Sequence, residues 1–125
     1  MSASPLVAIV DDDEDIRHSL CALFVSNGYA VATYASADAF CARANAQEGG
    51  ATPAMVITDL HMPGMTGLEM IRMLRGGGSE LPFVLVTAFA TPAIRSLARR
   101  YGVVDVVEKP FRPLRLLELV RETVG

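Results

Sequence analysis

Residues 55–67 read M-V-I-T-D-L-H-M-P-G-M-T-G and join a short apolar run to a loop rich in turn-forming residues. The run 55–58 contains β-branched residues and has proline on both sides, which indicates a buried β-strand. Asp59 then lies at the carboxyl end of this strand, the edge at which open α/β sheets bind ligands. Because Asp is also a common turn residue, this stretch alone leaves open whether Asp59 is functional or simply begins a turn.

The composition is that of one domain with its own hydrophobic core, covering residues 1–125, since 51% of the residues are apolar. The net charge of −3 argues against direct binding of nucleic acid. The N-terminal residues lack a basic segment and a long apolar run, so we expect no signal peptide and no membrane span. Cys21 and Cys41 are predicted to be free, buried or half-buried thiols, which fits a reducing cytoplasm.

Five apolar runs of strand length alternate with five helical patterns. The strands are predicted at residues 6–10, 30–34, 55–58, 83–86 and 103–107, and residues 47–53 are predicted to form a loop. The helices are predicted to begin after Asp13, Ser36, Thr66 and Thr91 and at Pro113, which are typical residues for helix starts. Continuous apolar strands separated by helices predict an α/β fold in which a five-stranded parallel sheet is covered on both faces, a doubly wound (βα)5 sandwich.

Polar residues follow four of the five strands: Asp11 and Asp12, Asp59, Thr87, and Lys109. Each has a simpler interpretation when taken alone, as a solvated acid, a turn residue, an ordinary β-former or a surface charge. In a parallel sheet, however, these strand ends share one edge. Lys109 is also the single lysine among eleven basic residues, and lysine is a compact point charge whereas arginine is a planar fork. We therefore expect these side chains to form one site.

Three carboxylates in one cleft repel one another, so the site needs a counter-charge. A hard divalent cation such as Mg²⁺ suits oxygen ligands, whereas zinc favours His or Cys. The nearby histidine is His61, of which we expect the backbone rather than the ring to matter. A cation beside a lysine and a hydroxyl also suits a phosphoryl group, and one carboxylate could then act as a nucleophile and form an aspartyl phosphate.

Four motifs occur in order along the chain: I-V-D-D-D-E-D-I-R, I-T-D-L-H-M-P-G-M-T-G, L-V-T-A and V-E-K-P-F. With these motifs the sequence resembles the receiver domain of bacterial two-component response regulators over essentially its whole length. It is most similar to receivers fused to helix-turn-helix output domains. The resemblance implies a flavodoxin-like fold, as in chemotaxis regulators, and a cytoplasmic signalling switch rather than an enzyme.

The resemblance also implies individual roles around a Mg²⁺ (or Mn²⁺) ion. Asp59 matches the phosphoacceptor, and Asp12 matches the acid that binds the metal directly. Asp11 matches the acid that holds the metal largely through water. His61 matches the position whose backbone carbonyl completes the metal site.

Three further positions match the parts that hold and sense the phosphoryl group. Thr87 matches the switch hydroxyl, Lys109 the phosphoryl-binding lysine, and Pro110 a proline that usually follows a cis peptide bond. The implied partner is a sensor histidine kinase or a phosphotransfer protein that donates phosphate from a phosphohistidine. Family members then hydrolyse the phosphate slowly by themselves.

The sequence departs from the family pattern at the position three residues before the lysine, where receivers usually carry Tyr or Phe. Val106 stands there, and its stiff side chain cannot swing as a ring does. We therefore expect phosphorylation to move the 89–92 loop and to report through backbone and helix shifts. Phe89 or Tyr101 could replace the missing ring, or both could simply pack. Phe89 and His61 also occupy positions that border the attacking water, and the apolar Phe89 predicts slow hydrolysis.

Two other functions remain open at this point. One is a degenerate receiver that acts as a phosphorylation-independent interaction module, which Val106 alone supports. The other is a hydrolase with an aspartyl-phosphate intermediate, against which His61 counts, because that class usually has a second acid at this position.

The segment 94–121 is rich in charged residues that the resemblance places on a face formed by the fourth helix, fifth strand and fifth helix. They are Arg95, Arg99, Arg100, Asp105, Glu108, Arg112, Arg115 and Arg121. Receivers dimerise or meet their targets through this face, which implies a homodimer here. The alternative is ordinary solvated surface charge.

Overall fold

The structure is a computed structural model that describes residues 4–46 and 52–124, so the predicted loop 47–53 lies mostly outside the described residues. Strands and helices alternate throughout. The strands are β1 (Leu6–Val10), β2 (Ala30–Tyr34), β3 (Met55–Asp59), β4 (Phe83–Thr87) and β5 (Asp105–Glu108). The helices are α1 (Glu14–Ser26), α2 (Ala37–Ala46), α3 (Gly67–Gly76), α4 (Pro92–Arg100) and α5 (Pro113–Val124).

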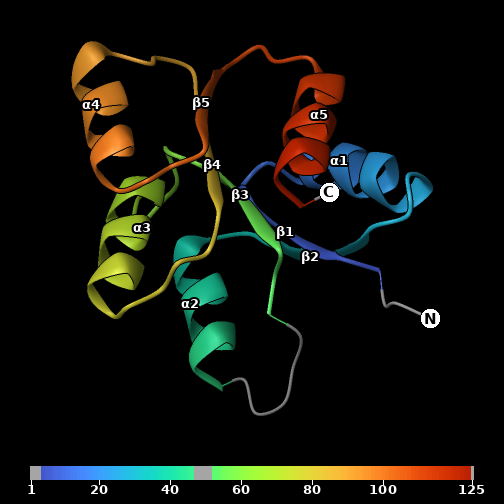
Figure 1. Ribbon diagram of the computed structural model, residues 1–125, viewed down its shortest axis with the longest axis horizontal. Helices are drawn as coiled ribbons and strands as arrows, with labels where there is room; N and C mark the ends of the chain where they lie inside the picture. Colours follow the sequence, from blue (N-terminus) through green and yellow to red (C-terminus); the bar gives the residue numbers. More distant parts are fainter. Residues whose placement is uncertain (1–3, 47–51, 125) are drawn as a thin grey trace.

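The five strands form one parallel sheet in the order β2-β1-β3-β4-β5. Helices α1 and α5 cover one face, and α2, α3 and α4 cover the other (Figure 1). The predicted doubly wound (βα)5 fold is confirmed. The strand order reverses beside β1, so the carboxyl ends of β1 and β3 lie next to each other at the ligand-binding edge.

Alternate residues of the central strands point into two separate hydrophobic clusters. In β1, Val7 and Ile9 pack with α1 and α5, whereas Ala8 and Val10 pack with α2, α3 and α4. Both sides of this strand are buried, as its uninterrupted apolar sequence predicted. The two cysteines are free thiols as predicted, with Cys41 buried and Cys21 half-buried.

The predicted helix caps are confirmed where the structure gives their hydrogen bonds. Asp13 accepts from the N–H groups of Asp15 and Ile16, and Ser36 accepts from Ala39 N at 3.0 Å. Thr66 and Glu69 form the predicted capping box. None of the helices in the described part of the chain is long and apolar enough to cross a membrane.

The predicted start of the fifth strand at residue 103 is wrong, because β5 begins at Asp105. Residue 103 belongs to the turn after α4, because Val103 N donates to Ala98 O at 2.9 Å and closes the end of that helix. Val104 N donates to Phe83 O at 2.8 Å, ahead of the regular pairing of β4 with β5. The sequence pattern could not separate these two residues from the strand, since valine favours strands wherever it stands.

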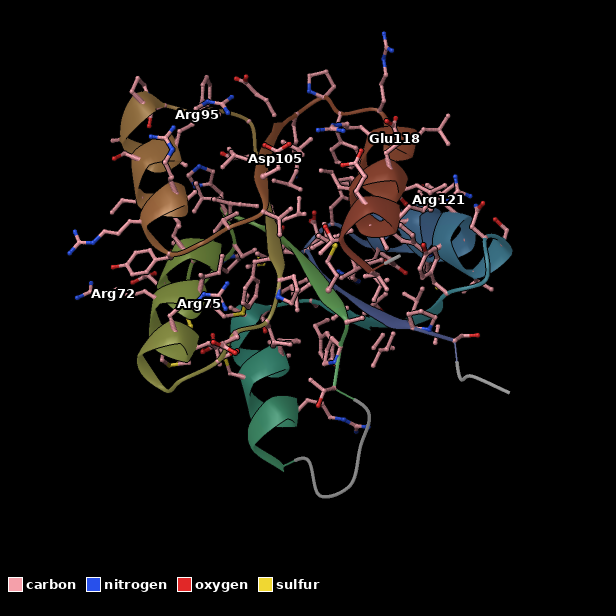
Figure 2. All side chains as sticks on the ribbon, in the orientation of Figure 1. Arg72, Arg75, Arg95, Asp105, Glu118 and Arg121 are labelled. Carbon is pink, nitrogen blue, oxygen red and sulfur yellow. The ribbon has the colours of Figure 1, made fainter. Side chains whose placement is uncertain are left out.

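Arg75, near the end of α3, connects three parts of the fold (Figure 2). Its Nε donates to the carbonyl oxygen of Tyr101, the C-cap of α4, at 2.8 Å. Its Nη1 donates to Ser79 O at 3.0 Å, and its guanidinium lies 5.3 Å from the centre of the Phe83 ring. A cation at the C-terminal end of a helix also suits the helix dipole. Arg75 therefore ties the last turn of α4 to α3 and to the start of β4.

Candidate functional site

Three aspartates meet at the carboxyl edge of the sheet. Asp11 and Asp12 follow β1, and Asp59 is the last residue of β3. One carboxylate oxygen from each lies within 4.8 Å of the others. Asp11 and Asp59 are 4% and 6% exposed, whereas Asp12 is exposed to solvent. The predicted acidic cluster is therefore present, with one open side at Asp12.

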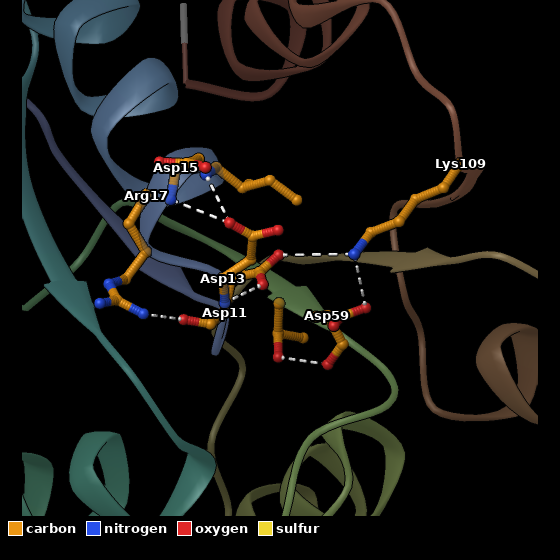
Figure 3. A network of polar contacts seen from close by, with 8 residues as sticks. Asp11, Asp13, Asp15, Arg17, Asp59 and Lys109 are labelled. Atoms are coloured by element: carbon orange, nitrogen blue, oxygen red, sulfur yellow. Dashed lines mark hydrogen bonds and ion pairs between the residues drawn. The ribbon is translucent and has the colours of Figure 1, made fainter.

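Lys109 reaches this cluster from the end of β5 (Figure 3). Its Nζ lies 3.4 Å from Asp59 Oδ1 and 3.8 Å from Asp11 Oδ2. Its backbone N–H donates to Thr87 O at 2.8 Å, which fixes the root of the side chain beside β4. The Lys109–Pro110 peptide bond is cis, as the resemblance to receiver domains implied. The structure thus brings the single lysine onto two of the three carboxylates.

Burial sets the protonation chemistry of the two enclosed carboxyl groups. It raises the pKa of Asp59 above its ordinary value, and the Lys109 ammonium opposes this shift. Burial likewise raises the pKa of Asp11; the hydrogen bond from Asp13 N lowers it, and the Asp59 charge raises it further. Burial therefore disfavours the charged form of both carboxyl groups, and a nearby cation would favour it.

This effect of burial predicts how stability depends on pH in a chelating buffer. A carboxyl group whose pKa is raised in the folded state stabilises the fold when the pH is below its ordinary pKa of 3.8. This stabilisation is lost as the pH rises through the folded-state pKa. The Asp59→Asn variant lacks one such group. We expect it to be more stable than the wild type at about pH 7, with a smaller advantage at about pH 4. Thermal unfolding of both proteins at the two pH values tests this, and an equal advantage at both would contradict it.

The donor set fits a divalent oxygen-binding cation. Three carboxylate groups beside one ammonium carry up to two uncompensated negative charges, which a doubly charged ion can balance. The cluster offers oxygen ligands only, which suits Mg²⁺ or Mn²⁺ rather than zinc. His61 is exposed, and the cluster found in the described residues does not include its ring. The role of its carbonyl stays a prediction.

Thr58 and Gly67 enclose the backbone of Asp59, and sequence reasoning did not single out either for this role. Thr58 is fully buried and its hydroxyl donates to Asp59 O at 3.0 Å. A Cβ on Gly67 would overlap that same carbonyl oxygen and would lie 3.2 Å from Leu85 Cδ1. The first residue of α3 therefore packs directly on the phosphoacceptor candidate, which requires glycine there.

The Thr87 hydroxyl faces the loop between β4 and α4. Thr87 is fully buried, and its Oγ1 accepts from Phe89 N at 3.2 Å and lies 3.5 Å from Phe89 O as a donor. The Phe89 side chain is 73% exposed. Thr87 thus links the end of β4 to the loop through the backbone, and the effect of Phe89 on hydrolysis stays a prediction.

Val106 stands at the position where receivers usually carry an aromatic ring. It is half-buried against the cluster under α2, α3 and α4, and it borders a cavity of about 230 Å³ between α4 and β5. Of the two aromatic residues considered as substitutes, Tyr101 packs against the same cluster and Phe89 is exposed. Tyr101 therefore packs as the simpler interpretation predicted, whereas Phe89 does not.

The chain is similar to known receiver domains over nearly its whole length. The model of the response regulator receiver domain family matches residues 7–121. The transcriptional regulatory protein FixJ from Rhizobium meliloti (strain 1021) is 36% identical over 114 residues, which is 91% of this chain and 54% of that protein. The chain thus spans about half the length of this relative.

Solved structures show the same fold at comparable identity. The crystal structure of FixJ-N superimposes with a TM-score of 0.81 at 34% identity and covers 99% of this chain and 95% of that one. A receiver protein from Pseudomonas putida gives 0.84 at 30% identity and covers 98% and 99%. With the family match over residues 7–121 and an acidic site completed by Lys109, the chain belongs to the response regulator receiver domain family.

Proposed function

We propose that Asp59 is the phosphoacceptor of a signalling switch. Receiver domains act in signalling rather than as enzymes in the ordinary sense. The observation that carries the proposal is the placement of the Asp59 carboxylate between the Lys109 ammonium and two further aspartates at the open edge of the sheet. A degenerate interaction module would not need these charges to converge, so the complete site favours the switch.

In the reaction, a carboxylate oxygen of Asp59 forms a bond to phosphorus while the bond from phosphorus to the donor breaks. The leaving group departs with that electron pair and takes a proton from solvent. Lys109 binds a phosphoryl oxygen and opposes the rise in the pKa of Asp59 that burial causes, which favours the ionised nucleophile. Asp11, Asp12, Asp59 and the His61 carbonyl would hold the Mg²⁺ ion, which neutralises phosphoryl charge when bound.

The readout begins at Thr87. In the present structure its hydroxyl is engaged with the backbone of Phe89. A phosphoryl group on Asp59 offers a charged acceptor, and a hydroxyl that turns towards it releases the loop ahead of α4. Phosphorylation then shifts a pre-existing equilibrium of this loop and helix, without an aromatic partner at Val106.

The donor is a phosphohistidine on a sensor histidine kinase or phosphotransfer protein. An apolar cleft of about 520 Å³ opens beside the acidic site and is lined by Ile16, Ala88, Lys109, Pro110 and Phe111. Apolar side chains around one half-buried ammonium suit a protein surface that delivers a phosphoryl group. We also place residues 1–125 as one receiver domain in the cytoplasm, acting in a transcriptional regulator as FixJ is named.

Two copies are proposed to associate through α4, β5 and α5 after phosphorylation. Figure 2 shows charged side chains of all three elements on this face. Arg115 lies 3.1 Å from Asp105, Arg95 lies 4.0 Å from Glu108, and Leu114 is 62% exposed. Sedimentation velocity with and without a beryllofluoride mimic of the phosphoryl group should show a dimer only with the mimic. Identical sedimentation would remove this interface from the proposal.

Intact mass measurement after incubation with Mg²⁺ and a small acyl-phosphate donor tests the function directly. We expect one phosphoryl adduct on the wild type and none on Asp59→Asn or without Mg²⁺. Asp15→Asn is the matched control, because this exposed acid lies in the first turn of α1 and outside the cluster. It should retain the adduct. A folded wild type that remains unmodified would favour the phosphorylation-independent module.

A further inference from the structure

Arg17 makes a contact that the phosphotransfer mechanism does not use. The residue lies on α1, and its side chain turns back to the end of β1, where Nη1 donates to the backbone carbonyl oxygen of Asp11 at 2.7 Å (Figure 3). The side chain is half-buried. A short hydrogen bond from a charged donor is stronger than one between neutral groups. Arg17 therefore holds the peptide group that joins Asp11 to Asp12.

The other polar groups of Asp11 are also fixed. Its N–H donates to Tyr34 O at 3.0 Å, its Oδ1 accepts from Asp13 N at 2.9 Å, and its Oδ2 faces Lys109. The orientation of the Asp11 carbonyl sets the orientation of the whole Asp11–Asp12 peptide group, since a peptide unit is planar and rigid. The exposed Asp12 carboxylate is one residue further on, and the structure gives it no hydrogen bond of its own within the described residues.

We propose that Arg17 is a positioning residue for the divalent-cation site. By fixing the Asp11–Asp12 peptide it keeps the Asp12 carboxylate within reach of Asp59, so the ion meets ligands that are already arranged. The inference rests on the metal site of the proposed function. Arg17 acts through geometry, by a short hydrogen bond that fixes the backbone carbonyl of Asp11.

Arg17 could instead serve only to fasten α1 to β1, and metal affinity separates the two roles. If Arg17 only attaches α1 to β1, its replacement would lower the unfolding temperature without changing how tightly Mg²⁺ binds. Loss of a group that orients metal ligands typically weakens affinity by about 10–100-fold. The change in unfolding temperature with Mg²⁺ concentration gives the affinity independently of phosphorylation.

The experiment compares Arg17→Met, which keeps an unbranched stem but removes the donors, with Arg17→Lys, which keeps one charged donor. Arg121→Ala is the matched control, because Arg121 also makes a 2.9 Å hydrogen bond, to Asn27, away from the site. We expect Mg²⁺ to bind Arg17→Met about tenfold more weakly, with a smaller loss in Arg17→Lys and none in Arg121→Ala.

Unchanged Mg²⁺ affinity in Arg17→Met would overturn the proposal, whatever happens to its unfolding temperature without metal. A wild type that Mg²⁺ does not stabilise would overturn it as well, together with the metal site. If Arg17→Met does not fold, Arg17→Lys decides in the same way. A wild type that binds Mg²⁺ but gains no phosphoryl adduct would reject the proposed function and leave the Arg17 result standing.

Discussion

Replacing Lys109 by alanine is expected to lower the rate of Asp59 phosphorylation by about 10²–10³-fold, the usual effect of removing one charge-stabilising group from a transition state. The ammonium is the cation that contacts both buried carboxylates among the described residues. Without it, the phosphoryl oxygens lose a partner, and the pKa of Asp59 rises further because a charge that lowers it is gone. The measurement is the rate of adduct formation from an acyl phosphate at saturating Mg²⁺.

Two variants make the Lys109 experiment specific. Arg112→Ala removes an exposed cation from the same segment between β5 and α5 and should leave the rate unchanged. Lys109→Arg keeps the charge but replaces a compact ammonium by a wide fork, so we expect only partial recovery. A rate for Lys109→Ala close to that of the wild type would show that the lysine is not a phosphoryl-binding group.

Replacing Gly67 by alanine is expected to destabilise the fold by about 1–3 kcal/mol, the usual cost of overpacking. The added methyl group would meet the carbonyl carbon of Asp59 at 3.2 Å and would overlap its oxygen. Backbone cannot move aside as the tip of a flexible side chain can, so the end of β3 must shift. We expect slower phosphorylation together with the lower stability, because the displaced residue is the phosphoacceptor.

Gly76→Ala is the matched control for this substitution, since Gly76 is in the same helix and a Cβ there meets nothing within 4 Å. It should stabilise the protein by about 0.4–1 kcal/mol by restricting the unfolded chain. Urea unfolding curves of the three proteins give both differences. Equal effects of the two substitutions would mean that helix propensity, and not the contact with Asp59, governs position 67.

Local pattern was sufficient for most of the fold and for the acidic site. Continuous apolar strands and side-chain caps such as Asp13 and Thr66 are short-range signals, and the structure contains both. The sequence was enough to predict that Asp11, Asp59 and Lys109 lie close together, because parallel strands place their carboxyl ends at one edge of the sheet. The resemblance then gave each a role that composition could not.

The missed features depend on where particular side-chain and backbone atoms lie in three dimensions, even when the residues are close in the sequence. Arg17 lies in a quoted motif, but nothing in the motif says that its side chain bonds to the Asp11 carbonyl. The need for glycine at position 67 follows from the approach of α3 to β3, which only coordinates show. The start of β5 depends on whether Val103 pairs with a strand or closes a helix.

The contact of Arg75 with the C-cap of α4 fixes one end of that helix and leaves the other end freer to move. The nine residues of α4 span about 13 Å, and Tyr101 at the held end is tied to α3. A rotation of about 10° about this end would carry the first turn by roughly 2 Å while the last turn stays almost still. The free end is the one that follows Thr87, so a movement that starts at the phosphorylation site would shift the first turn of α4 and leave its last turn close to α3.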